Sequence, residues 1–262
     1  MRKHFNLATV LICVQFLVSC SRIYAPEGFI RDINWEMTES EHFIFYYRDG
    51  SYAKRNIDSI INIEENAYKH ILNSLQLQYN GIISIYIYNS PEDAGWDRVK
   101  ALAYPRTETV EAIYSPVGKS IGVKGVACHE IAHVITWNTL GEPGTLFLSE
   151  GVAVAMDGEW HSKLDTITDL HLWVKKFIEE GTLPCLDDLI EYWGSVSGSI
   201  SYPLSGSFVL YLLHKYGAER FKQLFYRATS ANFYDEFQKI YNISLPVVEQ
   251  MWKDYCQNVY KK

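Results

Sequence analysis

The residues best suited to chemistry are His129, Glu130 and His133, which form a His-Glu-x-x-His pattern in a helical stretch. Residues four apart lie on one helix face, so both imidazoles can direct a nitrogen at one metal ion. Zinc accepts three protein ligands and keeps a fourth position for water. Glu130 lies about 100° further around the helix, where it can take a proton from metal-bound water. The spacing predicts a site for one Zn²⁺ per chain.

The apolar neighbours of this motif argue against the alternative, two solvated histidines on a helix face. A helix is expected over 121–140, and its apolar residues indicate that it is buried: Val126, Ala127, Ile131, Val134 and Ile135. Buried His and Glu side chains cost free energy unless they are paired, and a metal supplies that pairing. Thr136 and Thr139 stand where a longer zinc motif has Gly and a third His, so the third ligand must come from elsewhere.

The segment 147–153 reads Phe-Leu-Ser-Glu-Gly-Val-Ala and resembles the Trp-Leu-x-Glu-Gly-x-Ala element of gluzincin metallopeptidases, in the peptidase MA clan. The resemblance implies a gluzincin, thermolysin-like catalytic core in which Glu150 is the third zinc ligand. Two alternatives stay open. Glu150 can be a surface residue favoured by a helix start. Asp157, two turns later on the same face, can either orient a ligand histidine or replace Glu150 as the ligand.

The resemblance continues into 202–217, where a Tyr-x-x-Ser segment follows. It implies that Tyr202 donates a hydrogen bond to the oxyanion of the tetrahedral intermediate; the alternative is a core aromatic at a helix start. Val154 departs from the pattern, because many gluzincins have Asp there. The Gly-x-Met-Glu-Asn element that binds a substrate amine is absent, which favours an endopeptidase or another hydrolase over an aminopeptidase. The strand at 111–114 remains available to pair with an extended substrate.

The N-terminus has the features of an export signal. A basic head, Arg2-Lys3-His4, precedes an apolar run from Leu7 to Val18, which is too short to span a bilayer. Leu17-Val18-Ser19-Cys20 resembles the lipobox of bacterial lipoproteins, which implies cleavage before Cys20 and lipid attachment to its sulfur. The alternative is an ordinary cleaved signal. Residues 1–19 are therefore expected to be a signal peptide and 20–37 a tether, with the protein lipid-anchored outside the cytoplasm, at the outer membrane or cell surface rather than the inner membrane.

Composition limits the function classes. The net charge of −7 argues against nucleic-acid binding, because no basic excess is available to neutralise phosphates. Hydrophobic residues make up 48% of the 262-residue chain, which indicates a folded protein with a sizeable core. Three cysteines, Cys128, Cys185 and Cys256, follow the expected lipid site. Because three cannot all pair internally, at least one free, buried thiol is predicted.

The hydrophobic patterning predicts an α+β fold in which a small mixed sheet packs on a mainly helical part, forming one domain over 38–262. The front, 38–117, has strands expected at 42–47, 82–88 and 107–114, a helix over 53–75 and a helix start at Ser90-Pro91. The helical part, 118–262, has helices expected at 121–140, 147–156, 164–180, 202–216, 219–228, 234–241 and 245–260.

The first functional hypothesis is a lipid-anchored zinc metallopeptidase acting on peptides or proteins, with His129, His133 and Glu150 holding zinc and Glu130 as the base. The second is a catalytically inactive, lipid-anchored binding or assembly protein on the same fold. A third is a zinc hydrolase of non-peptide amides, which the sequence does not separate from the first. Neither the substrate nor the oligomeric state follows from the sequence.

Overall fold

The computed structural model describes residues 35–96, 100–114, 123–160 and 166–259, and for 123–127 the backbone alone. The expected signal peptide, the lipid site at Cys20 and most of the expected tether lie outside these residues. Within them, no helix is long and apolar enough to cross a bilayer.

A five-stranded mixed sheet occupies the N-terminal part, in the order β1-β2-β3-β5-β4. Strands β2, β3 and β5 run parallel, and β1 and β4 pair antiparallel at the two edges. The strands span Trp35–Glu39 (β1), Phe43–Arg48 (β2), Ile83–Tyr88 (β3), Ala101–Tyr104 (β4) and Thr109–Ile113 (β5).

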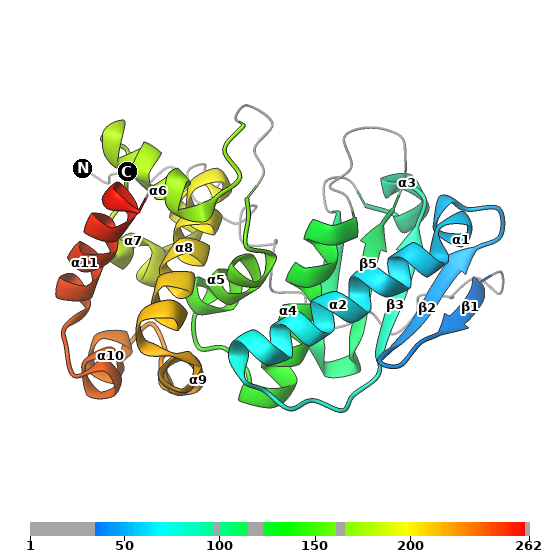
Figure 1. Ribbon diagram of the computed structural model, residues 1–262, viewed down its shortest axis with the longest axis horizontal. Helices are drawn as coiled ribbons and strands as arrows, with labels where there is room; N and C mark the ends of the chain where they lie inside the picture. The colour runs from blue at the N-terminus through cyan, green and yellow to red at the C-terminus, as the bar shows by residue number, and fades with distance from the viewer. Residues whose placement is uncertain (1–34, 97–99, 115–122, 161–165, 260–262) are drawn as a thin grey trace, which may run out of the picture. The chain divides into compact units, whose positions relative to one another are not determined.

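The alternation of buried and partly buried residues along β2 shows which face of the sheet is packed against the protein interior. Phe43, Phe45 and Tyr47 are buried, whereas the residues between them are only partly buried. The buried face packs against α2 (Ile57–Leu75), where the ring of Tyr68 meets Phe43 edge-on at 5.8 Å. Figure 1 shows α2 lying across the strands. A short helix, α1 (Tyr52–Arg55), precedes α2, and Ser51 caps it by accepting a hydrogen bond from the Lys54 amide.

Two short elements lie between β3, β4 and β5 along the chain. The first is α3 (Pro91–Ala94), which has Ser90 as its N-cap and Pro91 at its first position, the arrangement the sequence predicted. The second is a 3₁₀ turn, η1 (Pro105–Thr107), which joins β4 to β5.

The C-terminal part is helical. Its longest helices are α4 (Val123–Leu140), α5 (Leu146–Asp157), α8 (Gly198–Tyr216) and α11 (Leu245–Asn258). The shorter elements are α6 (Leu170–Glu179), α7 (Leu186–Glu191), η2 (Trp193–Ser195), α9 (Ala218–Arg227) and α10 (Phe233–Tyr241). Helix α4 packs on both α2 and α5, so it joins the sheet-bearing part to the helical part.

Helices α5 and α8 form the closest helix pair, because each presents a glycine to the other. A Cβ on Gly151 would lie 2.8 Å from Cγ2 of Val209. A Cβ on Gly206 would lie 2.8 Å from Cβ of Val154. Real Cβ atoms do not approach other atoms so closely, so the absence of side chains at both positions permits this packing.

The predicted α+β class is confirmed, but several boundaries differ. Trp35–Met37, assigned to the tether, form the first part of β1, and β4 and α7 were not predicted. Asn56 divides the helix expected over 53–75. Helix α6 begins at Leu170, not at 164. Helix α8 begins four residues before Tyr202, with Pro203 in its second turn, and not at 202.

Candidate metal centre

Three side chains from two helices converge at one point. Helix α4 carries His129 and His133, and α5 carries Glu150. The Nε2 atoms of the two imidazoles lie 3.2 Å apart. Oε2 of Glu150 lies 3.3 Å from Nε2 of His129 and 3.5 Å from Nε2 of His133. The three predicted ligands thus form a nearly equilateral triangle of donor atoms.

The size of this triangle fits zinc. Zinc binds His nitrogen at about 2.0–2.1 Å and carboxylate oxygen at about 2.0–2.2 Å in tetrahedral geometry, which sets neighbouring donor atoms about 3.3–3.5 Å apart. The separations of 3.2, 3.3 and 3.5 Å agree with this value. The side chain of Glu150 is only 2% exposed, but those of His129 and His133 are 15% and 12% exposed. The group is therefore reachable from solvent on the histidine side.

The electrostatics of the group favour a cation. Burial acts to raise the pKa of Glu150, but the imidazoles of His133 and His129 outweigh it and hold that pKa well below its usual range. Burial acts to lower the pKa of His129, but Asp157 and Glu150 raise it well above its usual range. A buried carboxylate and a proton-retaining imidazole share one small space, so a positive charge is stabilised there.

Two further contacts orient the imidazoles from behind. Oδ2 of Asp157 lies 3.4 Å from Nδ1 of His129. The hydroxyl of Ser149 lies 3.3 Å from Nδ1 of His133. Each ring is therefore held at Nδ1 while its Nε2 faces the common point, as expected for metal-binding histidines. Asp157 thus lies behind a histidine, and Glu150, not Asp157, supplies the oxygen near both Nε2 atoms.

Glu130 lies beside this group. The backbone N–H of Ala103 in β4 donates a hydrogen bond to its carboxylate. Burial is the largest influence and raises the pKa of Glu130, although the nearby histidines act in the opposite direction. A carboxylate with a raised pKa is a stronger base than an exposed one, which suits proton transfer near neutral pH.

The strand next to Glu130 is β4 and not the segment 111–114, which was expected to be available to an extended substrate. That segment belongs to β5, which lies between β3 and β4. Hydrogen bonding between Ile113 N–H and Lys100 C=O fixes the register, so Ala101 and Ala103 direct their backbone groups away from β5. The β4 edge of the sheet therefore faces the α4 side, where the N–H of Ala103 meets Glu130.

Tyr202 lies in α8, and its ring centroid is 6.2 Å from that of His129. The ring stacks on Trp160, with centroids 5.2 Å apart and planes 17° apart, and the edge of Trp193 packs against it at 5.5 Å. The structure thus brings Tyr202 to the site within an aromatic wall. Tyr202 is partly buried among these rings.

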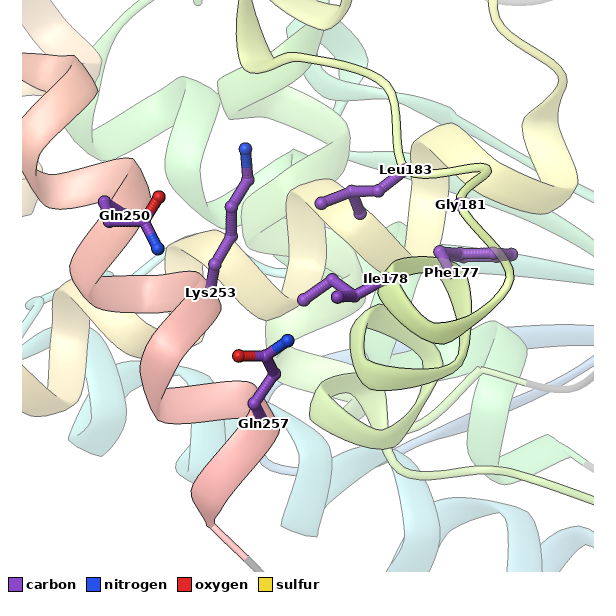
Figure 2. Close-up of a pocket in the computed structure, with 7 residues that line it drawn as sticks. All are labelled: Phe177, Ile178, Gly181, Leu183, Gln250, Lys253 and Gln257. Carbon is purple, nitrogen blue, oxygen red and sulfur yellow. The ribbon is translucent and has the colours of Figure 1, made fainter.

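Other polar clusters and hollows lie apart from this centre. Glu41, His42 and Glu65 form a second compact group, but Glu65 already accepts hydrogen bonds from Ser40, from the His42 amide and from the His42 ring. Figure 2 shows a pocket of about 290 Å³ between α11 and the α6 region, lined by Gln250, Lys253, Gln257, Phe177, Ile178 and Leu183 among others. Neither includes a residue of the His129 group.

Comparison of the chain with protein-family models and with curated proteins found no match. The support for the candidate metal centre is therefore the arrangement of its own side chains.

Sequence reasoning overlooked two contributors to the site. Ser149 was read only as part of a motif, although a hydroxyl next to a ligand glutamate on a helix is a signal for a contact with the facing helix. Trp160 lies after α5 and carried no local signal, because its contact with Tyr202 joins distant parts of the chain. Of the other histidines, His171 is buried and hydrogen-bonded to Ser207, and His161 lies outside the described residues.

Proposed function

We propose that this chain is a zinc-dependent metallopeptidase of gluzincin type. The observation that carries the proposal is the triangle of donor atoms from His129, His133 and Glu150, whose sides match tetrahedral zinc, with Glu130 beside it. A structural zinc site usually has four protein ligands, whereas three leave a position for substrate and water. The arrangement therefore favours catalysis over a purely structural role.

In this proposal zinc, when bound, polarises the substrate carbonyl and acidifies water. Glu130 takes a proton from water and later passes it to the leaving amine. The resemblance implies that Tyr202 donates a hydrogen bond to the oxyanion, and its ring centroid lies 6.2 Å from that of His129. The outward-facing backbone groups of Ala101 in β4, together with the C=O of Ala103, can bind an extended peptide at this edge of the sheet, which supports a peptide or protein substrate; the N–H of Ala103 already donates to Glu130.

Metal content tests the first half of the proposal. The soluble chain that begins after Cys20 is purified without added metal and analysed by mass spectrometry, beside Glu150→Ala. Glu65→Ala is the matched control, because it removes a carboxylate from the other His–Glu group. About one zinc per chain is expected in the wild type and control, with a sharp loss in Glu150→Ala. Absence of zinc after reconstitution would overturn the proposal.

Turnover tests the second half. Glu130→Gln keeps the shape of the side chain and the zinc ligands but removes the base, so it should retain zinc and lose hydrolysis of quenched fluorescent peptides. Zinc binding without hydrolysis by the wild type would instead support the inactive binding protein. Full activity of Glu130→Gln would contradict the catalytic assignment.

We also propose that the protein is exported and anchored by lipid at Cys20, outside the cytoplasm and at the outer membrane or cell surface. The support is the basic head, apolar run and Leu-Val-Ser-Cys box of the sequence. Labelling with radioactive palmitate tests it: the wild type should be labelled and fractionate with membranes, and Cys20→Ala should not. Membrane fractionation without label would leave an uncleaved signal as the anchor and overturn the lipid assignment.

A further inference from the structure

Cys128 immediately precedes His129 on α4 and connects this helix to the end of α5. Its buried thiol donates a hydrogen bond to the backbone carbonyl of Met156, with 3.1 Å between Sγ and the oxygen. The following residue of each helix makes the adjacent contact, between His129 and Asp157. Two consecutive residues of α4 thus hold two consecutive residues of α5.

The carbonyl that Cys128 binds has no partner within its own helix. Helix α5 ends at Asp157, and Gly158 takes a left-handed conformation whose amide bonds to Val154, one turn back. The carbonyl of Met156 therefore belongs to the last turn, where carbonyl groups lack an intrahelical donor. Met156 is only 3% exposed, so bulk water is not a ready substitute. A donor from outside the helix is required, and the thiol supplies one.

The position of the Cys128 thiol distinguishes it both from an ordinary core cysteine and from a metal ligand. It points at the end of α5, and the group of ligand atoms at the centre does not include it. Cys256 is also buried, but it lies near Ser207 and His171, at 3.8 and 3.7 Å, in contact with neither α4 nor α5 ligands. The chain thus contains a second buried thiol without this connection.

We infer that Cys128 is a positioning residue for the proposed zinc site. It fixes the end of α5 against α4, so that Asp157 reaches Nδ1 of His129 and keeps Nε2 of that ring directed at Glu150. The inference rests on the proposed function for its effect on zinc. The contact itself, and its effect on the His129 ring, are independent of metal.

Zinc affinity is measured by competition with a chromophoric chelator, in the wild type, Cys128→Ala, Cys128→Ser and Cys256→Ala. Loss of the donor in Cys128→Ala should raise the zinc dissociation constant about tenfold, the lower range for residues that orient metal ligands. Cys128→Ser retains a donor and should recover most of the affinity. Cys256→Ala removes the other buried thiol and should leave the zinc dissociation constant unchanged while lowering thermal stability. Equal zinc affinity in all four proteins would overturn the inference.

A double-mutant cycle tests the route. If Cys128 acts through Asp157, Cys128→Ala should have no further effect on zinc affinity in an Asp157→Asn background. Additive effects would mean that the thiol does not position Asp157, and would overturn that route.

The ¹⁵N NMR signals of the His129 ring in chelator-treated protein supply a measurement that needs no metal. Cys128→Ala should shift these signals, and Cys256→Ala should not. A shifted ring in a protein that binds no zinc would keep the positioning role and refute the proposed function. An unshifted ring would overturn the positioning role, whether or not zinc binds.

Discussion

Nδ1 of His129 lies 3.4 Å from Oδ2 of Asp157, while Nε2 of the same ring lies 3.3 Å from Oε2 of Glu150. One imidazole is thus held between two carboxylates that come from the same helix, α5. A carboxylate behind a ligand histidine fixes which nitrogen carries the proton and makes the other a better donor to a metal. Asp157 thus lies where it could orient His129, the role that the resemblance implies for an Asp at the position of Val154.

Replacing Asp157 by Asn should therefore weaken zinc binding without abolishing it. The amide keeps the size of the side chain but loses its charge, and changes to such residues typically cost about 10–100-fold in metal affinity or activity. The measurement is the zinc dissociation constant by chelator competition. Asp235→Asn, on the exposed side of α10, is the control. A dissociation constant equal to that of the wild type would refute the role of Asp157.

Zinc affinity should fall steeply as the pH is lowered. Asp157 and Glu150 overcome burial and hold the pKa of His129 well above its usual range, so the metal-free protein keeps a proton that zinc must displace. Burial raises the pKa of Asp157 to about 6, against the opposing influence of His129, so this carboxylate also becomes protonated below about pH 6. Isothermal titration calorimetry in buffers of different ionisation enthalpy should report proton release at pH 7. No proton release would contradict the prediction.

Glu64 should destabilise the fold increasingly as the pH rises. Its side chain is buried in α2, Oε2 has no hydrogen-bond partner among the described residues, and burial raises its pKa well above the usual range. The folded state then binds a proton more tightly than the unfolded state. The protonated carboxyl therefore carries no penalty below the unfolded pKa near 4.5, and the free energy of unfolding falls as the pH rises from there through the folded pKa.

The apolar variant Glu64→Met should relieve this penalty. A gain of about 1–3 kcal/mol in the free energy of unfolding is expected near neutral pH, the range for a buried polar group without a partner. Urea unfolding from pH 5 to 9, in chelator, should show the gain growing with pH. A gain that stays constant across this range would show that the carboxyl does not titrate as described.

The close contact of α5 with α8 makes Gly206 sensitive to the smallest side chain. Gly206→Ala would place a methyl group against Cγ1 of Val154 and 2.8 Å from its Cβ, and such overpacking costs about 1–3 kcal/mol. Thermal unfolding measures this loss. Val154→Ala removes the opposing methyl groups, so the double variant should recover part of the stability relative to Gly206→Ala alone. If the double variant is no more stable than Gly206→Ala, the side chain of Val154 is not the cause of the overpacking.

The convergence of the two histidines could be predicted from the sequence because the signal is local. His129 and His133 are one helical turn apart, so their convergence follows from helix geometry alone. Glu150 was assigned by resemblance, and its place opposite both rings depends on how α4 crosses α5. The contacts of Trp160 with Tyr202, and of Cys128 with Met156, depend on tertiary packing between separate elements and left no periodic pattern.

The fold shows the same division between local and distant signals. Strands β2 and β3 are rich in β-branched and aromatic residues and were predicted. Strand β4, Ala-Leu-Ala-Tyr, has only four residues and two alanines, so its strand character comes from pairing with β5. Strand β1 mixes two acidic residues with Trp35 and Met37, and its pairing with β2 was not visible in the sequence.

Helix α5 is buried on every side from Phe147 to Met156, and Glu150 is part of this buried run. The carboxylate of the centre therefore comes from an element whose amide hydrogens are expected to exchange only when the whole domain opens. Local breathing cannot withdraw Glu150 while the remaining core stays closed. Loss of the centre and global unfolding should consequently be one cooperative event, and any adjustment during binding must come from the incoming molecule or the surrounding loops.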